Sequence, residues 1–360
     1  MKKSIKLLSV ILCIAALLCA LPSCGRMGNA DVHVFYYTYS DTYISTVRSA
    51  LDKRLKDAGI KYQDHDANNS QTTQTEQIQT AITNGARAIV VNIVTTGSDD
   101  AAMGIVDLAK KADIPVIFFN REVSDSVVSS YDKCSFIGTN AKEAGYLQGD
   151  MIGDFLVKNY SAVDLNKDGK ISYVMFMGEK GNNEAIYRTT YSVENANKKL
   201  SAAGKPALNF YDPHNSDKYL LDRDGKWSAQ AANEYMTTLL SSYNVANGNM
   251  VELIICNNDG MASGAISALN VAGFNTGAEN SVSIPVFGVD ATAAARELIA
   301  QGKMAGTIRQ DSDGMAEAIE KAVRNHLDGK DVTEGMDKFN VDGKVRKIRI
   351  PYSVYTGENT

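Results

Sequence analysis

The sequence lacks the motifs that would indicate metal-dependent, nucleophilic or nucleotide-dependent catalysis. Its 360 residues contain only four histidines, which are scattered without the spacing of metal ligands and without an obvious serine or cysteine partner. No G-x-G-x-x-G segment opens a helix after an apolar run, and there is no P-loop, so a nucleotide cofactor would have no phosphate cradle. We therefore expect the protein not to be an enzyme.

Cysteine is scarce in the part of the chain that is expected to fold. Three of the five cysteines precede residue 25, which leaves only Cys134 and Cys256. Both lie in apolar, strand-like runs, where free cysteine is commonly buried. We expect two inert core thiols and no disulfide between them.

An excess of positive charge is also missing. The formal net charge of -5 gives no electrostatic basis for binding nucleic acid or an anionic membrane. The apolar run from Leu7 to Leu21 is too short for a bilayer, which needs about 20 apolar residues. Because Lys2, Lys3 and Lys6 precede this run, it is typical of an export signal.

The export signal ends in Leu21-Pro22-Ser23-Cys24-Gly25, which resembles the bacterial lipoprotein box. In that box the cysteine is lipidated and becomes the new N-terminus. The resemblance implies a signal peptide over residues 1–24, lipidation of Cys24 and an extracytoplasmic protein that touches the membrane only through its anchor. Pro22 is atypical of the box, and the alternative is a signal cut by the ordinary peptidase near the same place.

What the sequence does contain is an alternation of short apolar runs and longer amphipathic segments. The runs are Val32–Tyr37, Ala88–Val94, Pro115–Phe119, Ile171–Met177, Val251–Cys256 and Ile284–Val289. The helix-period segments are Thr42–Lys56, Thr75–Thr83, Ala141–Leu156, Asn183–Lys199, Ala229–Leu240 and Gly260–Val271. This βαβ pattern predicts an α/β protein with helices on both faces of parallel sheets. At roughly 150 residues per domain, the length predicts two domains.

Polar side chains follow several of the apolar runs. They are Asn120, Asn257, Asn258, Asp259 and Asp290. Each one taken alone also fits a helix N-cap. Because ligands of open parallel sheets bind beyond the carboxyl ends of the strands, the set together indicates a binding site. Amides and carboxylates at one sheet edge suit a neutral, polyhydroxylated ligand.

Two segments, Tyr37–Tyr43 and Pro115–Glu122, closely resemble the periplasmic galactose/glucose-binding proteins. Four others carry the same resemblance: Asp164–Gly169, Arg188–Tyr191, Asn257–Asp259 and Ile284–Asp290. They follow the family order from about Val32 to Tyr352, which is nearly the whole mature chain. The sequence thus resembles the substrate-binding component of a sugar ABC transporter in its lipoprotein form.

The resemblance implies two Rossmann-like lobes with parallel sheets, of the periplasmic-binding-protein type I, with the ligand in the interlobe cleft. Three crossings of the chain would join the lobes. The first lobe is expected at 31–139 plus 312–344, and the second at 140–311 plus 345–360. Composition alone predicts only two α/β units.

A pyranose needs aromatic rings against its faces and polar side chains around its rim. The resemblance places the rings at Tyr43 and at Trp227, the only tryptophan. It places the rim at Asp41, Asn120, Arg188, Asn258 and Asp290. The alternative for Trp227 is a core or lobe-surface anchor, and Asp41 also fits a cap of the helix that starts near Thr42.

Three implied site residues depart from the family pattern. Asn182 stands where the family usually has histidine, Glu184 where it has aspartate and Gln310 where it has asparagine. Each keeps its hydrogen-bonding capacity, but glutamate and glutamine are one methylene longer. A pentose or another monosaccharide is therefore the alternative ligand.

The segment Asp164–Ser172 matches the first nine positions of an EF-hand calcium loop. Asp164, Asn166 and Asp168 occupy positions 1, 3 and 5, but Met175 stands at position 12 in place of glutamate. The family resemblance supplies Glu252 as the missing carboxylate, Lys170 through its carbonyl and Ser172 through water. Structural calcium is the expected cofactor, and the alternative is a solvated Asx-rich turn.

The expected function is extracytoplasmic binding of D-glucose or D-galactose and delivery to an ABC transporter permease by hinge closure. The protein is expected to be a monomer without a nucleic-acid partner. A sugar sensor that presents its closed form to a chemoreceptor is a second interpretation, which the sequence does not separate from the first. A cytoplasmic sugar-responsive regulator is disfavoured, because an export signal stands where its DNA-binding domain would be.

Overall fold

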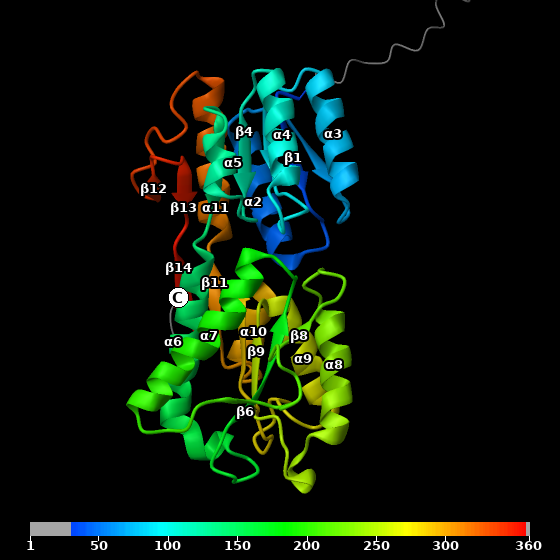
Figure 1. Ribbon diagram of the computed structural model, residues 1–360, viewed down its shortest axis with the longest axis vertical. Helices are drawn as coiled ribbons and strands as arrows, with labels where there is room; N and C mark the ends of the chain where they lie inside the picture. Colours follow the sequence, from blue (N-terminus) through cyan, green and yellow to red (C-terminus); the bar gives the residue numbers. More distant parts are fainter. Residues whose placement is uncertain (1–29, 358–360) are drawn as a thin grey trace, which may run out of the picture.

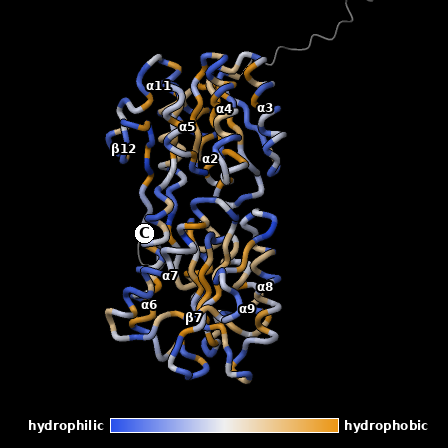
Figure 2. The backbone as a smooth tube through the Cα atoms, in the orientation of Figure 1, coloured by the Kyte–Doolittle hydropathy of each residue, from blue (hydrophilic) through white to orange (hydrophobic). Residues whose placement is uncertain are grey.

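Two β-sheets of seven strands each form the framework of residues 30–357, the part of the chain that this computed structural model describes. Helices cover each sheet, and the two resulting lobes lie end to end along the long axis of the molecule (Figure 1). Hydrophobic residues concentrate inside each lobe (Figure 2). The prediction of two α/β lobes with largely parallel sheets is confirmed.

The first sheet has the strand order β12-β13-β5-β4-β3-β1-β2. Neighbouring strands are parallel except for the antiparallel pair β12 and β13. The strands are β1 (Val32–Tyr36), β2 (Tyr62–Asp66), β3 (Ala88–Val91), β4 (Val116–Phe119), β5 (Cys134–Gly138), β12 (Asn340–Asp342) and β13 (Lys347–Arg349).

Helices cover both faces of this sheet because its central strands are apolar on both sides. Val34 and Tyr36 of β1 pack into one core, whereas Phe35 packs into the other. The helices are α2 (Thr42–Asp57) and α11 (Ser312–Leu327) on the first face, and α3 (Gln71–Thr83), α4 (Asp100–Lys111) and α5 (Asp125–Ser129) on the second.

The second sheet has the order β14-β11-β10-β9-β6-β7, and β8 also pairs with β6. Neighbours are parallel except for β14, which is antiparallel to β11. The strands are β6 (Ser172–Met177), β7 (Asn209–Phe210), β8 (Leu220–Leu221), β9 (Leu253–Cys256), β10 (Val286–Asp290), β11 (Gly306–Gln310) and β14 (Tyr352–Tyr355).

A hydrophobic core also lies on each face of the second sheet, between the sheet and its covering helices. Val174 and Phe176 of β6 pack against one set of helices, and Tyr173 and Met175 pack against the other. The first set is α8 (Ala229–Ser242), α9 (Asp259–Val271) and α10 (Ala293–Ala300), and the second is α6 (Ala141–Val163) and α7 (Asn183–Ala202). A short 3₁₀ helix, η1 (Val245–Asn247), precedes β9.

The chain crosses between the lobes three times. β5 leads into α6 through Thr139, β11 leads into α11 through Asp311, and β13 leads into β14 through Ile350 and Pro351. The first and third crossings lie together, since the Thr139 hydroxyl is 2.8 Å from the Tyr352 hydroxyl. The lobes are therefore joined by three segments of chain, two of which are in contact.

The third crossing lies later in the chain than the sequence-based boundary between residues 344 and 345. β13 pairs in parallel with β5, with Lys347 opposite Phe136 and Arg349 opposite Gly138. This segment therefore belongs to the first sheet, and only β14 joins the second. The predicted boundary was wrong by about six residues, because a short strand carries no sign of which sheet it joins.

Both cysteines of the described residues are free and buried, as predicted. Burial raises the pKa of the Cys134 thiol to about 12 and raises the pKa of Cys256 well above its ordinary value. Both thiols therefore stay protonated and unreactive at neutral pH.

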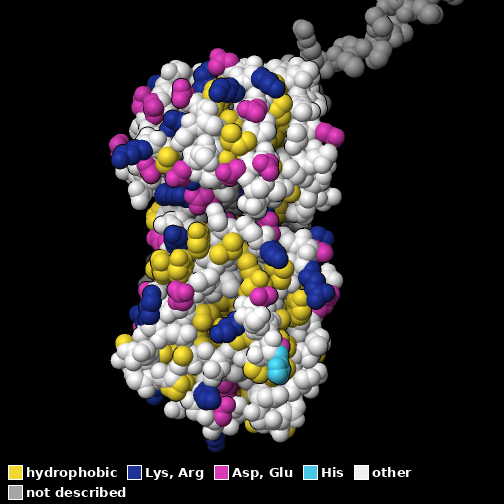
Figure 3. Space-filling view, in the orientation of Figure 1, with side chains coloured by type: hydrophobic (Ala, Val, Ile, Leu, Met, Phe, Trp, Pro, Cys, Tyr) yellow, Lys and Arg dark blue, Asp and Glu magenta, His cyan; other side chains and the backbone are white. Residues whose placement is uncertain are grey.

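The predicted signal peptide and lipidation site, residues 1–24 with Cys24, lie outside the described residues. Within 30–357, every helix falls short of the combination of length and apolar character needed to cross a membrane. Side chains of both charge signs are mixed over the face shown in Figure 3.

Candidate functional site

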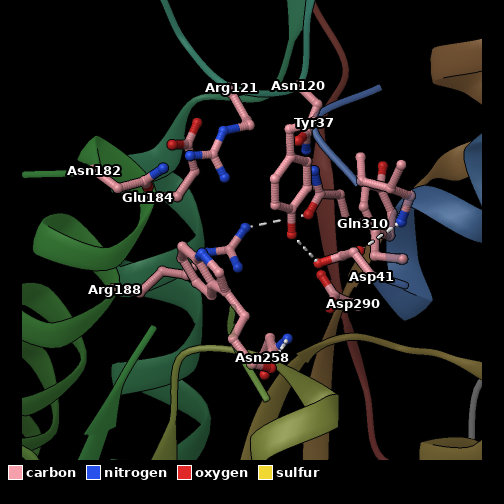
Figure 4. A pocket seen from close by; sticks show the side chains of 13 residues that line it. Tyr37, Asp41, Asn120, Arg121, Asn182, Glu184, Arg188, Asn258, Asp290 and Gln310 are labelled. Atoms are coloured by element: carbon pink, nitrogen blue, oxygen red, sulfur yellow. Dashed lines mark hydrogen bonds between the residues drawn. The ribbon is translucent and has the colours of Figure 1, made fainter. Parts of the chain in front are cut away.

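A cavity between the lobes is lined by all ten side chains that the resemblance implied. They are Asp41, Tyr43, Asn120, Asn182, Glu184, Arg188, Trp227, Asn258, Asp290 and Gln310. The labelled polar groups converge on a common space in Figure 4. Tyr37, Ile44 and Arg121 line the same cavity and were not predicted.

Three of these residues have backbone conformations that residues with a side chain rarely adopt. The φ angle is 61° at Asn120, 56° at Trp227 and 124° at Asp290. Asn120 directly follows β4, and Asp290 is the last residue of β10. Such strain persists where the surrounding fold holds it, and it often accompanies binding sites.

Several lining residues also cap helices, so these polar residues are both helix N-caps and part of the cavity wall. Asp41 Oδ1 accepts a hydrogen bond from the Ile44 amide at 2.7 Å and thereby caps α2, while its Oδ2 accepts from the Tyr37 hydroxyl at 2.7 Å. Asn258 Oδ1 caps α9 by accepting from the Met261 amide at 2.9 Å. The caps fix these side chains at the cavity wall.

Arg188 lies at the centre of the site and is only 4% exposed. Its guanidinium donates to the Asn257 carbonyl at 2.8 Å, to Gln310 Oε1 at 3.1 Å and to the Tyr352 hydroxyl at 2.9 Å. Because the last of these residues begins β14 beside the interlobe crossings, Arg188 links the cavity to the hinge.

Two buried carboxyls face this guanidinium. Burial raises the pKa of Glu184, and Arg188 opposes that shift. Burial also raises the pKa of Asp290 well above its ordinary value, again against the attraction of Arg188. Ligand groups that donate hydrogen bonds to these carboxyls would favour their charged forms.

The cavity holds buried polar atoms without a hydrogen-bond partner. They are both carboxylate oxygens of Glu184, Gln310 Nε2, Arg188 Nε and Arg121 Nε. Buried polar groups are nearly always satisfied, so this concentration indicates an absent partner. Since donors and acceptors both occur, the partner must both accept and donate, as hydroxyl groups do.

The two predicted rings differ in their surroundings. Tyr43 is 5% exposed, packs into the first lobe's core and places its hydroxyl 3.8 Å from Met315 Sδ. Trp227 is 8% exposed and packs on Gly178, with its Nε1 donating to Glu179 Oε2 at 3.3 Å. Both rings line the cavity. Tyr43 is part of a large hydrophobic core, whereas the buried cluster of Trp227 contains only Met177 and Ala185 besides Trp227 itself.

A model of the periplasmic binding protein domain family matches residues 32–331, most of the chain. This chain belongs to that family. It is 35% identical to the D-galactose/methyl-galactoside binding periplasmic protein MglB of Haemophilus influenzae over 347 residues, which cover 96% of this chain and 95% of that one. It is 28% identical to a putative rhizopine-binding protein of Rhizobium meliloti, over 89% and 88% of the two chains.

Solved structures share the fold of this periplasmic binding protein. An ABC transporter solute binding protein of Clostridium phytofermentans with bound β-D-glucose has a TM-score of 0.69 at 22% identity, covering 91% of this chain and 94% of the other. One from Bacillus halodurans with bound myo-inositol has a TM-score of 0.68 at 24% identity, covering 93% and 97%. At these identities the likeness establishes the architecture alone.

Of the three departures from the family pattern, Asn182 has a hydrogen bond to the other lobe. Its Oδ1 caps α7 by accepting from the Ala185 amide at 3.1 Å. Its Nδ2 donates to Thr96 Oγ1 and to Glu179 Oε2, both at 3.4 Å. Glu184 and Gln310, by contrast, keep unpartnered atoms in the cavity.

The predicted calcium loop of the periplasmic binding protein is held together by its own backbone amides. The Asp168 amide donates to Asp164 Oδ1 and Asn166 Oδ1, both at 3.1 Å, and the Gly169 amide donates to Asp164 Oδ2 at 2.9 Å. The Lys170 amide donates to Asp168 Oδ1 at 2.8 Å. These bonds gather the side-chain oxygens of positions 1, 3 and 5 around one short segment.

Glu252 lies against this loop, although it is distant in sequence. Its Oε1 accepts from the Leu165 amide at 2.7 Å, and its Oε2 accepts from the Ser172 amide at 3.1 Å. The Ser172 hydroxyl donates to the Met250 carbonyl and so points away. Within 30–357, no group of three or more histidine, cysteine, aspartate or glutamate side chains is placed to hold a metal ion. The donors suit calcium in type, but the ion would compete with the amides.

Sequence reasoning missed Arg121 and Glu179, which meet across the lobe boundary. Arg121 NH2 lies 2.7 Å from Glu179 Oε2, and the Arg121 side chain is only 5% exposed. Arg121 follows Asn120 at the end of β4, so the position at a strand end was an available signal. No pattern in the sequence indicates its partner, because Glu179 lies in the other lobe.

We expect Gly178→Ala to displace the Trp227 ring. A Cβ atom at Gly178 would lie 2.2 Å from two atoms of that ring, so the ring must move, and such overpacking costs about 1–3 kcal/mol. Because Trp227 is the only tryptophan, its emission should shift to longer wavelength as water reaches the ring. Gly104→Ala in α4 is the control, since nothing lies within 4 Å of its Cβ position. Identical emission from both variants would contradict this packing.

Proposed function

We propose that this periplasmic binding protein binds D-glucose or D-galactose outside the cytoplasm and delivers it to the permease of an ABC importer, without chemical change to the sugar. The observation that carries the proposal is the set of unpartnered donors and acceptors in the interlobe cavity, with the Trp227 ring at the wall. A hydroxyl-rich ring with apolar faces satisfies both features. The name of the Haemophilus influenzae relative, a galactose-binding protein, supports the same ligand class.

Both lobes supply groups to the site, which gives a physical basis for closure. Asp41, Tyr43 and Asn120 come from the first lobe, and Glu184, Arg188 and Asn258 come from the second. A sugar that contacts both sets stabilises the closed arrangement relative to the open one, because only that arrangement completes its hydrogen bonds. The closed form is then the shape that the permease recognises.

The second candidate is another monosaccharide or polyol. Glu184 and Gln310 keep free polar atoms, and both are longer than the family residues, so their contacts would be shifted by about one bond length. The neighbours of similar fold include proteins with bound myo-inositol, D-allose and arabinofuranose. The choice among ligands therefore rests on these two side chains and Asn182.

The test is a calorimetric and thermal-shift screen of a chain from residue 30 against glucose, galactose, xylose, ribose, arabinose and an unrelated polyol. We expect a selective response to glucose and galactose. A response to a pentose alone would overturn the assignment of glucose or galactose and support the second candidate. No response to any of these compounds would leave the fold assignment intact and overturn the sugar-binding proposal.

Lipidation of Cys24 and presentation to a chemoreceptor stay predictions from the sequence. The first has a direct check in the mass of the mature N-terminal peptide, which should carry the lipid on this cysteine. The second would appear as a chemotactic response that is lost with the gene while transport is supplied by another importer.

We also propose that calcium binds at Asp164, Asn166, Asp168 and Glu252, displaces the backbone amides that bond these oxygens in the structure, and stabilises the second lobe. A ligand at a hundredfold excess over its Kd stabilises a fold by about 2.7 kcal/mol. For a lobe of this size that corresponds to a rise of roughly 5–10 °C in melting temperature. Chelation should therefore lower the melting temperature by that amount, with little change in sugar affinity.

Asp168→Ala should abolish the calcium response. Asp212→Ala is its matched control, because Asp212 also accepts a backbone amide in an exposed turn, from His214 at 2.9 Å, away from the loop. Equal melting temperatures of the unmutated protein in chelator and in excess calcium would contradict the site.

A further inference from the structure

A second cavity lies beside the proposed sugar site. Here it is called the outer cavity, and its walls include Asn69 and Thr95–Gly97 of the first lobe and Lys180 and Leu221–Gly225 of the second. Tyr37 and Arg121 line both cavities, whereas Glu179 lines only the outer one. The Arg121 side chain therefore stands in the partition between them.

The partition is fixed by an ion pair that joins the two lobes. Arg121 NH2 lies 2.8 Å and 2.7 Å from the two carboxylate oxygens of Glu179 and also donates to the Val94 carbonyl at 2.9 Å. The guanidinium lies 4.3 Å from the centre of the Tyr37 ring. Only 18% of the Glu179 side chain is exposed, so solvent screens the pair weakly.

Glu179 also contacts the groups that shape the sugar cavity. Its Oε2 accepts from Trp227 Nε1 at 3.3 Å and from Asn182 Nδ2 at 3.4 Å. Arg121 and Asn182 lie on the same side of the cavity in Figure 4, the side that this carboxylate backs. One carboxylate thus pairs with the guanidinium and also accepts hydrogen bonds from two other residues of the cavity wall.

A buried guanidinium without this partner would favour an anionic ligand, because phosphate and carboxylate groups make strong paired hydrogen bonds with arginine. We propose that Glu179 is the specificity-determining residue that restricts the site to neutral monosaccharides and excludes phosphorylated ones. Its carboxylate occupies the Arg121 guanidinium, which a phosphate group would otherwise bind. This inference rests on the proposed function, since it concerns the ligand class of the same site.

The test compares neutral and phosphorylated ligands by calorimetry. The probes are the hexose that the unmutated protein binds in the screen above and its 1-phosphate and 6-phosphate. The unmutated protein should bind only the neutral hexose. Glu179→Ala should bind one of the two phosphates at least tenfold more tightly than the unmutated protein does, because it frees Arg121 and opens the partition. Glu179→Ser serves the same purpose if the alanine variant melts early.

Two controls separate a specific effect from a general change in charge. Asp224→Ala removes an acidic residue that lines the outer cavity but not the sugar cavity and pairs with Lys226, so its phosphate binding should not change. Arg121→Ala combined with Glu179→Ala should lose the gain, because the cation is gone. A gain that persists in the double variant, or that appears equally in Asp224→Ala, would overturn the role of Glu179.

The failure of this inference is distinguishable from the failure of the proposed function. A protein that binds no neutral monosaccharide in the screen would overturn both. The other outcome is that the protein binds the neutral hexose, but Glu179→Ala and Glu179→Ser bind the sugar phosphates no better than the unmutated chain does. That outcome would overturn only the specificity role of Glu179.

Discussion

Replacing Arg188 by methionine should weaken sugar binding by at least about a hundredfold. The guanidinium donates to three acceptors, of which Gln310 lines the cavity, and it faces the buried carboxyls of Glu184 and Asp290. At a binding site, truncating one member of a buried, hydrogen-bonded charge pair costs about 2–5 kcal/mol of affinity, largely because its partner stays buried and unpaired. Since about 1.4 kcal/mol is a tenfold change in Kd, a loss of about 3 kcal/mol already accounts for the expected effect.

The measurement is titration calorimetry with the best ligand of the screen, together with a thermal melt. Arg188 also bonds the Tyr352 hydroxyl near the hinge, so Arg188→Met should melt earlier as well. Arg188→Lys keeps the charge without the planar fork, and it should restore stability more than affinity.

Arg309→Met is the matched control for this prediction. Arg309 precedes the cavity residue Gln310 on β11, but 55% of its side chain is exposed and it pairs with Asp311 at 3.5 Å. Its loss should change neither affinity nor stability measurably. If Arg188→Met binds as tightly as Arg309→Met, the guanidinium does not contact the ligand.

The central strands were predictable because they are buried on both faces. β1, β3 and β4 consist almost entirely of buried residues, which leaves continuous apolar runs in the sequence. β2 (Tyr62–Asp66) left no such run, because it is an edge strand with the sequence Tyr-Gln-Asp-His-Asp. Its pairing with β1 defines it as a strand, and that contact depends on tertiary structure.

The polar residues of the site were predictable where they terminate strands. Asn120, Asn258 and Asp290 follow or end buried runs, and the parallel topology brings such ends to one edge of each sheet. The resemblance supplied Arg188 and Trp227, whose positions in α7 and before α8 follow from no strand-end rule. The positive φ angles that aim Asn120, Trp227 and Asp290 become visible only in the structure.

The contacts between the lobes were predictable neither from the residue pattern nor from the family resemblance. Arg121 and Glu179 are separated by 58 residues and follow strands of different sheets, so their pairing depends on the relative placement of two independently packed cores. Asn182 shows the same limit, because its side chain bonds Thr96 across the boundary as well as capping its own helix. The hydrophobic periodicity of the sequence predicts the strands and helices of each lobe, but it contains no information about the relative position of the two lobes.

Trp227→Ala should weaken sugar binding by roughly ten- to a hundredfold while leaving the protein folded. Stacking of a nucleic-acid base on an aromatic side chain contributes about 1–3 kcal/mol per base, and we take this as the scale for a sugar ring. The cost to stability should be smaller than for a tryptophan in a large core, since Trp227 shares its buried cluster with only Met177 and Ala185. Affinity and stability should therefore separate in this variant.

Two companion variants of Trp227→Ala distinguish stacking from the other contacts of the side chain. Trp227→Phe keeps an aromatic face but loses the Nε1 bond to Glu179, so it should retain most of the affinity if stacking dominates. Tyr243→Ala removes a ring that packs on Tyr211, 4.8 Å between centroids, and lies outside the cavity lining, so its sugar affinity should not change. Unchanged affinity in Trp227→Ala would assign the ring a packing role in the second lobe. A loss shared equally by Trp227→Phe would instead assign the effect to the Glu179 bond, because the aromatic face is still present in that variant.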